Sequence, residues 1–281
     1  MKKRFKIGIV GCGAIGSRLA KTLPKELKDD YVLAGLFDID LQKTLSLSKS
    51  FPNKKIIKST LKELIKSCDI VVEAINTNTA KEIVREALKA KKSILTASVG
   101  QLLNAQDLFE FAEKQGCKIL IPSGAIAGID AIKAGQLVPF QKITQITRKP
   151  ITGFKNDPYL AQKGIDLSKI KKDTVIFEGS VDDAVKAFPR NINVAATLSL
   201  ACQDKKKVLV KLITSPKYKE NSHEIEMIGA FGRINTKTVN VICPDNPKTS
   251  YLAVLSVIQT LKQFSSGVFV GTQIPLLLMK N

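Results

Sequence analysis

The sequence predicts an α/β chain in which a doubly wound parallel sheet is followed by a smaller α+β region. Up to residue 124, short continuous apolar runs alternate with amphipathic runs, which is typical of parallel strands covered by helices on both faces. After residue 125 this rhythm changes, and strand-like runs rich in β-branched residues dominate. These two observations predict two domains, 1–124 and 125–244, with 245–281 returning to the first.

Six apolar runs are the expected strands of the first region. They cover residues 4–11, 31–38, 54–58, 68–75, 92–98 and 117–124. Helices are expected from about residue 14 and over 61–67, 79–91 and 104–116. The last of these has Asn104 as a candidate N-cap and Gly116 as a candidate C-cap.

The second region predicts a sheet of its own. Its expected strands cover residues 142–150, 174–180, 207–216, 223–232 and 236–244. Helices are expected over 181–189 and 193–203, and a long terminal helix over 246–264. The interval 151–173 has no clear period, so we expect a long loop there.

The composition is that of an ordinary globular protein, with 44% hydrophobic and 25% charged residues in 281. The cysteines are odd in number and none forms a CxxC pair, which argues against a disulfide framework and against a zinc site; no metal is expected. A reducing, cytoplasmic setting is the simple interpretation.

The late apolar run IPLLLM is too short to span a bilayer, so no membrane partner is expected.

The net charge of +19 raises nucleic acid as a partner. The lysines are scattered along the whole chain, however, and there is no tryptophan to supply a stacking platform. This distribution favours a solvated, lysine-rich surface and makes nucleic-acid binding an unlikely function. A positive field would still attract anionic small molecules.

The run GCGAIG places Gly11, Gly13 and Gly16 in a G-x-G-x-x-G pattern between an expected strand and an expected helix. This context is typical of a Rossmann domain, in which the turn and the helix N-terminus, here Ala14 and Ile15, bind the pyrophosphate of a dinucleotide. The sequence therefore predicts a nicotinamide dinucleotide as cofactor.

Asp38 ends the second expected strand about twenty residues past Gly16, where a carboxylate binds the ribose hydroxyls. Its charge would repel a 2′-phosphate, which favours NAD over NADP, although the nearby Lys43 keeps NADP open. Asp38 as a helix cap is the alternative. Asn76, at the end of the fourth strand, is a candidate for the nicotinamide side or, equally, a helix cap.

Four later stretches resemble the L-aspartate dehydrogenase family. They are SGAIAGIDA at 123–131, FPRNINVAA at 188–196, NSHEIEMIGAFG at 221–232 and NPKTSYLA at 246–253. The resemblance implies a Rossmann domain with an α+β catalytic and dimerisation domain, assembled as a homodimer. It also implies oxidation of L-aspartate with NAD or NADP to iminoaspartate, which hydrolyses to oxaloacetate and ammonia or feeds NAD biosynthesis.

The resemblance also assigns residues. The N-x-H motif makes His223 the catalytic group, and Ala125 and Asn193 are the expected cofactor contacts. His223 is the only histidine in the chain, and an unperturbed imidazole titrates near neutral pH, which suits general acid–base catalysis. The alternative is a histidine on a sheet face that makes a structural hydrogen bond.

The substrate carries two carboxylates, so its site must offer hydrogen-bond donors. The expected start of the last helix brings together Lys248, Thr249 and Ser250, which supply an ammonium and two hydroxyls. A capped helix start with Lys248 in solvent is the alternative. Asn193 is a candidate to orient the nicotinamide amide or the substrate, to cap a helix beginning at Val194, or to do both.

Two other functions are compatible with the sequence. One is another two-domain reductase of the dihydrodipicolinate reductase or homoserine dehydrogenase type, although the catalytic stretches of those enzymes are not found here. The other is a non-catalytic protein that senses NAD or binds nucleic acid through its positive charge.

Overall fold

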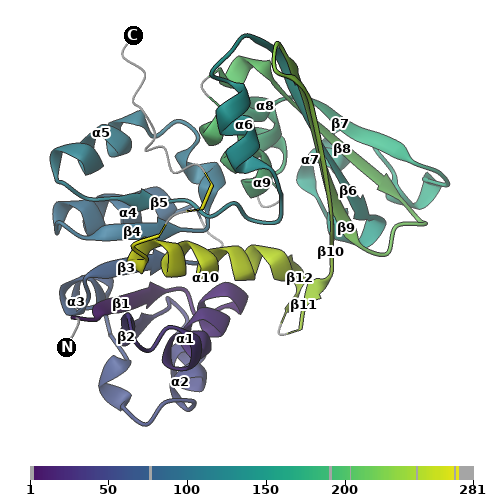
Figure 1. The fold of residues 1–281 in the computed structure, drawn as a ribbon. Coiled ribbons are helices and arrows are strands. Elements are labelled where there is room, and N and C mark those ends of the chain that lie inside the picture. Colours follow the sequence, from purple (N-terminus) through teal and green to yellow (C-terminus); the bar gives the residue numbers. More distant parts are fainter. Residues whose placement is uncertain are drawn as a thin grey trace. The chain divides into compact units, whose positions relative to one another are not determined.

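The computed structural model describes residues 3–75, 78–189, 192–202, 204–244, 246–268 and 270–271. These residues form two compact units (Figure 1). The first unit contains the chain up to Pro122 together with Val254–Val268, and the second contains Ser123–Ala253.

The first unit is built on a parallel sheet with the strand order β2-β1-β3-β4-β5. Its strands are β1 (Phe5–Val10), β2 (Tyr31–Phe37), β3 (Ile70–Glu73), β4 (Ser93–Thr96) and β5 (Ile119–Leu120). The chain leaves β1 in one direction to β2 and returns on its other side to β3. The carboxyl ends of β1 and β3 therefore form a topological switch point, where such sheets bind ligands.

The expected strand at 54–58 is wrong, so the sheet has five strands instead of six. Lys54–Ile56 form a short 3-10 helix, η1, because the Asn53 side chain accepts a hydrogen bond from the backbone of Lys55 and starts a turn. Only Ile57 pairs with the sheet, through a single bridge to Leu36.

The helices of the first unit agree with the expected alternation. They are α1 (Ala14–Glu26), α2 (Leu41–Ser48), α3 (Leu61–Ser67), α4 (Ala80–Lys89), η2 (Val99–Leu102) and α5 (Gln106–Lys114). Helix α2 is not predicted above, although Asp40 caps it by accepting from Gln42 N. Helix α5 has Ala105 in the N-cap position instead of Asn104 and Gln115 in the C-cap position instead of Gly116. Gly116 follows the C-cap in the left-handed conformation (φ 65°).

The terminal helix α10 (Tyr251–Ser265) packs back on the first unit, as expected. The buried Tyr31 hydroxyl donates to the carbonyl of Leu261 at 2.6 Å, and the Ser265 hydroxyl donates to Asp30 at 3.0 Å. The rings of Phe5 and Phe264 meet edge to face with centroids 5.7 Å apart. The end of the helix is therefore fixed to β2 and to the turn before it.

The second unit is built on a mixed sheet with the strand order β10-β9-β6-β8-β7. Its strands are β6 (Phe140–Pro150), β7 (Thr174–Ser180), β8 (Val208–Ser215), β9 (Asn221–Gly229) and β10 (Gly232–Asn240). Strands β6 and β8 pair in parallel, and the other neighbours are antiparallel. All five expected strands of this region are present.

The helical segments of the second unit are α6 (Ile129–Gly135), η3 (Ile151–Phe154), α7 (Pro158–Gln162), η4 (Leu167–Lys169), α8 (Val181–Ala187), α9 (Asn193–Ala201) and η5 (Lys205–Lys207). Helices α6, α8 and α9 lie on one side of the sheet in Figure 1. The expected loop at 151–173 contains α7, which starts because Asp157 caps it and Pro158 occupies its first turn. Helix α6 was not expected.

The last helix begins later than the sequence suggests. Asn246–Ser250 form a strand, β12, which pairs with β11 (Ile242–Cys243). Pro247 disfavours helix in the residue before it, and the backbone of Tyr251 donates to Val241 at 3.0 Å, which ties the segment to β11. Across the described residues, every helix is too short or too polar to cross a bilayer.

Candidate active site

The glycine turn after β1 has the geometry of a phosphate-binding loop. Gly11 has φ 97°, and a Cβ there would lie 2.5 Å from the carbonyl oxygen of Ala74. A Cβ on Gly16 would overlap the carbonyl oxygen of Gly11. At Gly13, by contrast, no heavy atom of the described residues other than Gly13 itself and its two chain neighbours lies within 4 Å of that position. Two glycines thus serve the fold, and Gly13 leaves open space for a ligand.

The start of α1 supplies the donors for an anion. Gly13 occupies the N-cap position without a side-chain cap, and the first turn holds no acidic residue. The backbone N–H groups of Ala14, Ile15 and Gly16 lie in that first turn, where α-helical geometry provides no intrahelical acceptor. Together with the helix dipole, these groups fit the pyrophosphate of a dinucleotide.

Asp38 lies beside this turn, as expected for a ribose ligand. Its Oδ2 accepts from the backbone N–H of Cys12 at 2.7 Å, and its Oδ1 accepts from Asp40 N at 2.9 Å. The interpretation of Asp38 as a helix cap is wrong, because Asp40 caps α2. The ammonium of Lys43 lies 3.7 Å from Asp40 Oδ2. Asn76, the other expected contact here, lies outside the described residues.

Glu73, at the end of β3, is a residue that the sequence reasoning missed. Its carboxylate is fully buried and accepts from Ile75 N at 2.8 Å, from the Ser98 hydroxyl at 2.7 Å, from Ser98 N at 3.2 Å and from the Thr96 hydroxyl. It therefore joins the ends of β3 and β4 just behind the glycine turn. A glutamate within an otherwise apolar strand was the available signal.

His223 lies on β9, near the centre of the second sheet, and is 5% exposed. Its Nδ1 and the Thr147 hydroxyl are hydrogen-bonded at 2.9 Å, and Thr147 and His223 are direct partners between β6 and β9. The Thr147 oxygen in turn accepts from Gln145 Nε2 at 2.6 Å. We call these three side chains, Gln145, Thr147 and His223, the polar row.

The expected near-neutral titration of His223 is wrong for this structure. Burial, and to a lesser extent the positive charge of Lys149, lowers its pKa from 6.5 to about 3. Burial also lowers the pKa of Lys149 from 10.5 to about 8. Lys149 follows Thr147 by two residues on β6 and so shares its face of the sheet. The neutral imidazole thus has a neighbour that titrates closer to neutral pH.

The loop that carries Ala125 is attached to the strand next to His223. The carbonyl of Ala125 accepts from the Thr238 hydroxyl at 2.8 Å and from Asn240 Nδ2 at 3.2 Å. Thr238 is the direct partner of His223 between β10 and β9. The second unit therefore brings Ala125 and His223 together. Asn240 Oδ1 is buried without a partner among the described residues.

Asn193 is the first residue of α9 and is exposed. Its expected role as a helix cap is wrong, because Ile192 holds the N-cap position and makes no side-chain cap. A Cβ on Gly124 would lie 4.0 Å from Val194, which places the start of α9 beside the loop of Ala125.

The expected helix start at Lys248, Thr249 and Ser250 is wrong, because the last helix begins at Tyr251. Lys248, Thr249 and Ser250 belong to β12, and the side chain of Lys248 lies outside the described residues. Ser250 pairs with Ile242 and immediately precedes α10. Within the described part of the chain, no hydrogen bond joins Thr249 or Ser250 to the polar row.

The described residues offer no metal-binding cluster, and three of their thiols are held in the protonated form. They contain no group of three or more histidine, cysteine, aspartate or glutamate residues that could hold a metal ion. Burial raises the pKa of Cys12, Cys68 and Cys202 to about 11, so these thiols stay protonated and unreactive at neutral pH.

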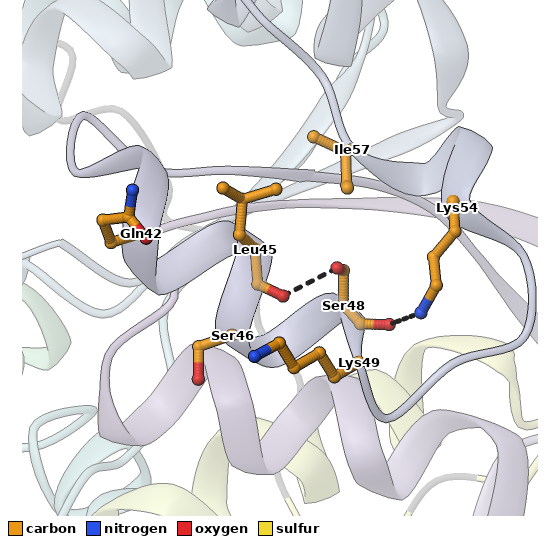
Figure 2. A pocket seen from close by; sticks show the side chains of 7 residues that line it. All are labelled: Gln42, Leu45, Ser46, Ser48, Lys49, Lys54 and Ile57. Carbon is orange, nitrogen blue, oxygen red and sulfur yellow. Dashed lines mark hydrogen bonds between the residues drawn. The ribbon is translucent and has the colours of Figure 1, made fainter.

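A surface pocket of about 470 Å³ lies between α2 and η1 (Figure 2). It is lined by Gln42, Leu45, Ser46, Ser48, Lys49, Lys54 and Ile57. The ammonium of Lys54 is engaged with the backbone carbonyls of Ser48 at 2.7 Å and Phe51 at 2.8 Å. The pocket contains none of the expected site residues.

Comparison with known proteins decides the family. The chain is 43% identical over 271 residues to the L-aspartate dehydrogenase of Methanosarcina mazei, which covers 95% of this chain and 100% of the relative. It is 38% identical, with the same coverage, to the L-aspartate dehydrogenase of Methanococcus maripaludis. The chain belongs to the L-aspartate dehydrogenase family. It is an NAD(P)-dependent amino-acid dehydrogenase, and the two alternative functions lose their support.

The two halves of this L-aspartate dehydrogenase family member match separate family models. Residues 130–264 match the C-terminal region of aspartate dehydrogenase, and residues 11–122 match the NAD-binding domain of homoserine dehydrogenase. Among solved structures, the aspartate dehydrogenase of Thermotoga maritima has a TM-score of 0.68 at 24% identity, covering 96% of this chain and 100% of that one. A hyperthermophilic archaeal homoserine dehydrogenase in complex with NADPH has a TM-score of 0.60 at 13% identity, with 93% and 97% coverage. These structures share the fold.

Proposed function

We propose that the protein oxidises L-aspartate to iminoaspartate, with NAD as its preferred acceptor and His223 as the group that exchanges protons with the substrate. The observation that carries the proposal is the single histidine of the chain, held in the polar row beside the loop of Ala125. Iminoaspartate then hydrolyses to oxaloacetate and ammonia or serves NAD biosynthesis.

The first unit would hold the cofactor. The open side of Gly13 and the N–H groups at the start of α1 fit its pyrophosphate, and the Asp38 carboxylate fits the ribose hydroxyls. Ala125, Asn193 and Asn76 are the proposed contacts on the nicotinamide side. When bound, the nicotinamide accepts the hydride that leaves Cα of aspartate.

The preference for NAD depends on charge at the end of β2. The Asp38 carboxylate would repel a 2′-phosphate, and the Lys43 ammonium that would attract one lies beside the Asp40 carboxylate. Asp38→Ala should therefore weaken NAD more than NADP and lower the ratio of their kcat/KM values by about tenfold. Steady-state kinetics with both cofactors measure this ratio, and an unchanged ratio would exclude Asp38 as the ribose ligand.

His223 is neutral in the protein alone, because its pKa is about 3. The substrate changes this situation, since an opposite charge within a few ångströms favours the protonated imidazole. The two carboxylates of aspartate would raise the pKa of His223 towards the range in which general acid–base catalysis is efficient. The same ring can then exchange a proton with the substrate amine and with the water that attacks the imine.

The substrate carboxylates need partners of opposite charge. Lys149 shares the face of the polar row, and its ammonium is a donor for one carboxylate. Asn193, Lys248, Thr249 and Ser250 remain proposed substrate contacts. The net charge of +19 favours the approach of an anionic amino acid.

His223→Ala tests the catalytic assignment. General acid–base help is typically worth ~10²–10⁴ in rate, so kcat with aspartate should fall by about that factor while the KM for NAD stays nearly constant. Absorbance of NADH reports both values. Ser222→Ala is the matched control, because Ser222 lies on the same strand but faces the other side of the sheet. Activity of His223→Ala within about threefold of the wild type would overturn the assignment.

We also propose a homodimer, as the family resemblance implies. Light scattering of the purified protein tests it, and a mass equal to one chain would contradict it.

A further inference from the structure

The side chains of the polar row form a chain of hydrogen bonds that ends on the imidazole of His223. Gln145, Thr147 and His223 are 1%, 2% and 5% exposed, so water does not compete for their hydrogen bonds. Gln145 Nε2 donates to the Thr147 oxygen at 2.6 Å, and the same oxygen lies 2.9 Å from His223 Nδ1. The distance between Thr147 and His223 is that of a well-formed hydrogen bond, and the distance between Gln145 and Thr147 is short for an N–H···O bond.

A threonine hydroxyl has one hydrogen to donate. In the polar row the Thr147 oxygen already accepts from Gln145, and within the described residues its other side-chain partner is His223 Nδ1. A buried hydroxyl hydrogen without an acceptor is costly, so the favoured arrangement directs it at Nδ1, which accepts it with its lone pair. A neutral imidazole that accepts at Nδ1 carries its own hydrogen on Nε2.

The other ring nitrogen is accessible. His223 Nε2 makes no hydrogen bond within the described part of the chain, and it is absent from the fully buried, unpaired side-chain atoms there, which are Arg148 Nη1, Ser199 Oγ and Asn240 Oδ1. Nε2 is therefore not completely buried, and it keeps a small accessible area through which a ligand atom can meet it.

We propose that Thr147 and Gln145 are positioning residues for the reaction: they hold the proton of neutral His223 on Nε2, so that the ring meets the substrate as a hydrogen-bond donor. The role in the reaction rests on the proposed function of His223. A donor at Nε2 hydrogen-bonds a carboxylate oxygen or the attacking water. Transfer of the Nε2 proton starts from the imidazolium, which the bound carboxylates favour, and leaves a neutral ring. With the proton on Nδ1 instead, Nε2 would present a lone pair and repel a carboxylate.

The single histidine makes the proton directly observable. In the full chain labelled with ¹⁵N-histidine, one pair of ring nitrogens gives all the signals, and long-range ¹H–¹⁵N correlations identify the protonated one. The wild type at neutral pH should show a protonated Nε2 and an unprotonated Nδ1. A wild-type spectrum with the proton on Nδ1 would overturn the proposal, whether or not any variant folds.

Variants of Thr147 then test the link to catalysis. Thr147→Val has nearly the same shape but no hydroxyl, so the proton should move partly or wholly to Nδ1, and kcat with aspartate should fall by about tenfold or more. Thr147→Ser restores the hydroxyl and should return both the spectrum and kcat to within about threefold of the wild type. The KM for NAD should change little in either variant.

The possible failures are distinguishable. If His223→Ala is fully active, the proposed function of His223 is wrong, while the nitrogen spectrum still reports whether Thr147 fixes the proton. If Thr147→Val shifts the proton and kcat is unchanged, or if Thr147→Val lowers kcat without shifting the proton, the positioning role is wrong. Loss of activity in Thr147→Ser equal to that in Thr147→Val would likewise contradict it, because both serine and threonine can donate to Nδ1.

Discussion

The surroundings of His223 lower the pKa of its imidazole. Between pH 6.5 and about 3 the unfolded chain protonates this imidazole and the folded chain does not. The stability contributed by the neutral ring is therefore complete above pH 6.5 and is lost as the pH falls towards 3, by about 1.4 kcal/mol per pH unit at most.

Lys149→Met should raise the pKa of His223, because it removes the positive charge that disfavours the imidazolium. The pKa should stay below 6.5, since burial is the larger cause of its depression. A pH titration of the histidine ring signals by NMR measures the change. Lys142→Met, an exposed change on the same strand, should leave the histidine pKa where it is. A lower or unchanged pKa in Lys149→Met would show that the ammonium does not act on this ring.

Within the glycine turn, packing requires two of the glycines and leaves open space beside the third. The three glycines occupy one short segment between β1 and α1, yet their surroundings differ. Gly11 and Gly16 are enclosed by backbone atoms, whereas Gly13 faces space that no described residue fills. The same motif thus combines two glycines required by packing and one beside which packing leaves open space.

Gly13→Ala and Gly16→Ala should therefore fail in different ways. Gly13 has φ −76° and ψ −159°, which alanine tolerates, so the fold should lose only about 1 kcal/mol while NAD affinity falls by about tenfold or more. Gly16→Ala should destabilise the first unit strongly, because its Cβ would overlap the carbonyl oxygen of Gly11. Denaturant unfolding and NAD titration separate the two effects. Equal loss of stability in both variants would refute the distinction.

At the scale of the whole molecule, the chain passes from the first unit to the second and then returns. Residues 254–268, which include most of the terminal helix, belong to the first unit, although the preceding strand belongs to the second. The return is held by aromatic packing of Phe264 on Phe5 and by the buried hydrogen bond from Tyr31 to Leu261. The first strand and the terminal helix are thus part of one core.

Tyr31→Phe should lower the free energy of unfolding by about 1–2 kcal/mol, because a buried carbonyl loses its hydrogen bond while the ring contacts remain. Denaturant titration measures the change. Tyr159→Phe is the control, since it keeps the packing of the ring on Phe177 and Phe188 in the second unit. If both variants have the same stability as the wild type, the Tyr31 bond does not fix the helix.

Much of the fold could be predicted because its signals are local. The helix at 61–67 and the strand at 174–180 have their expected bounds, and the glycine turn and Asp38 lie together as the motif implies. Periodicity and turn chemistry depend on near neighbours in the chain, so they can be read without coordinates. The motifs that indicate the family are likewise contiguous runs.

The errors also have physical reasons. The run at 54–58 was expected as a strand, but a side-chain cap from Asn53 turned most of it into a 3-10 helix. The last helix begins at Tyr251 because β12 pairs with β11, which displaces Lys248, Thr249 and Ser250 from the helix N-terminus. In both segments a specific hydrogen bond overrode the local hydrophobic pattern.

The sequence by itself determined the doubly wound sheet, the phosphate-binding turn, the carboxylate beside it and the presence of one imidazole in the second region. Only the tertiary structure decided the hydrogen-bond partner, the burial and the pKa of that imidazole. His223 meets Thr147 across 76 residues of chain, and this pairing sets its partner, its burial and its depressed pKa. Strand pairing and burial are properties of distant segments brought together, so no local pattern along the chain could supply them.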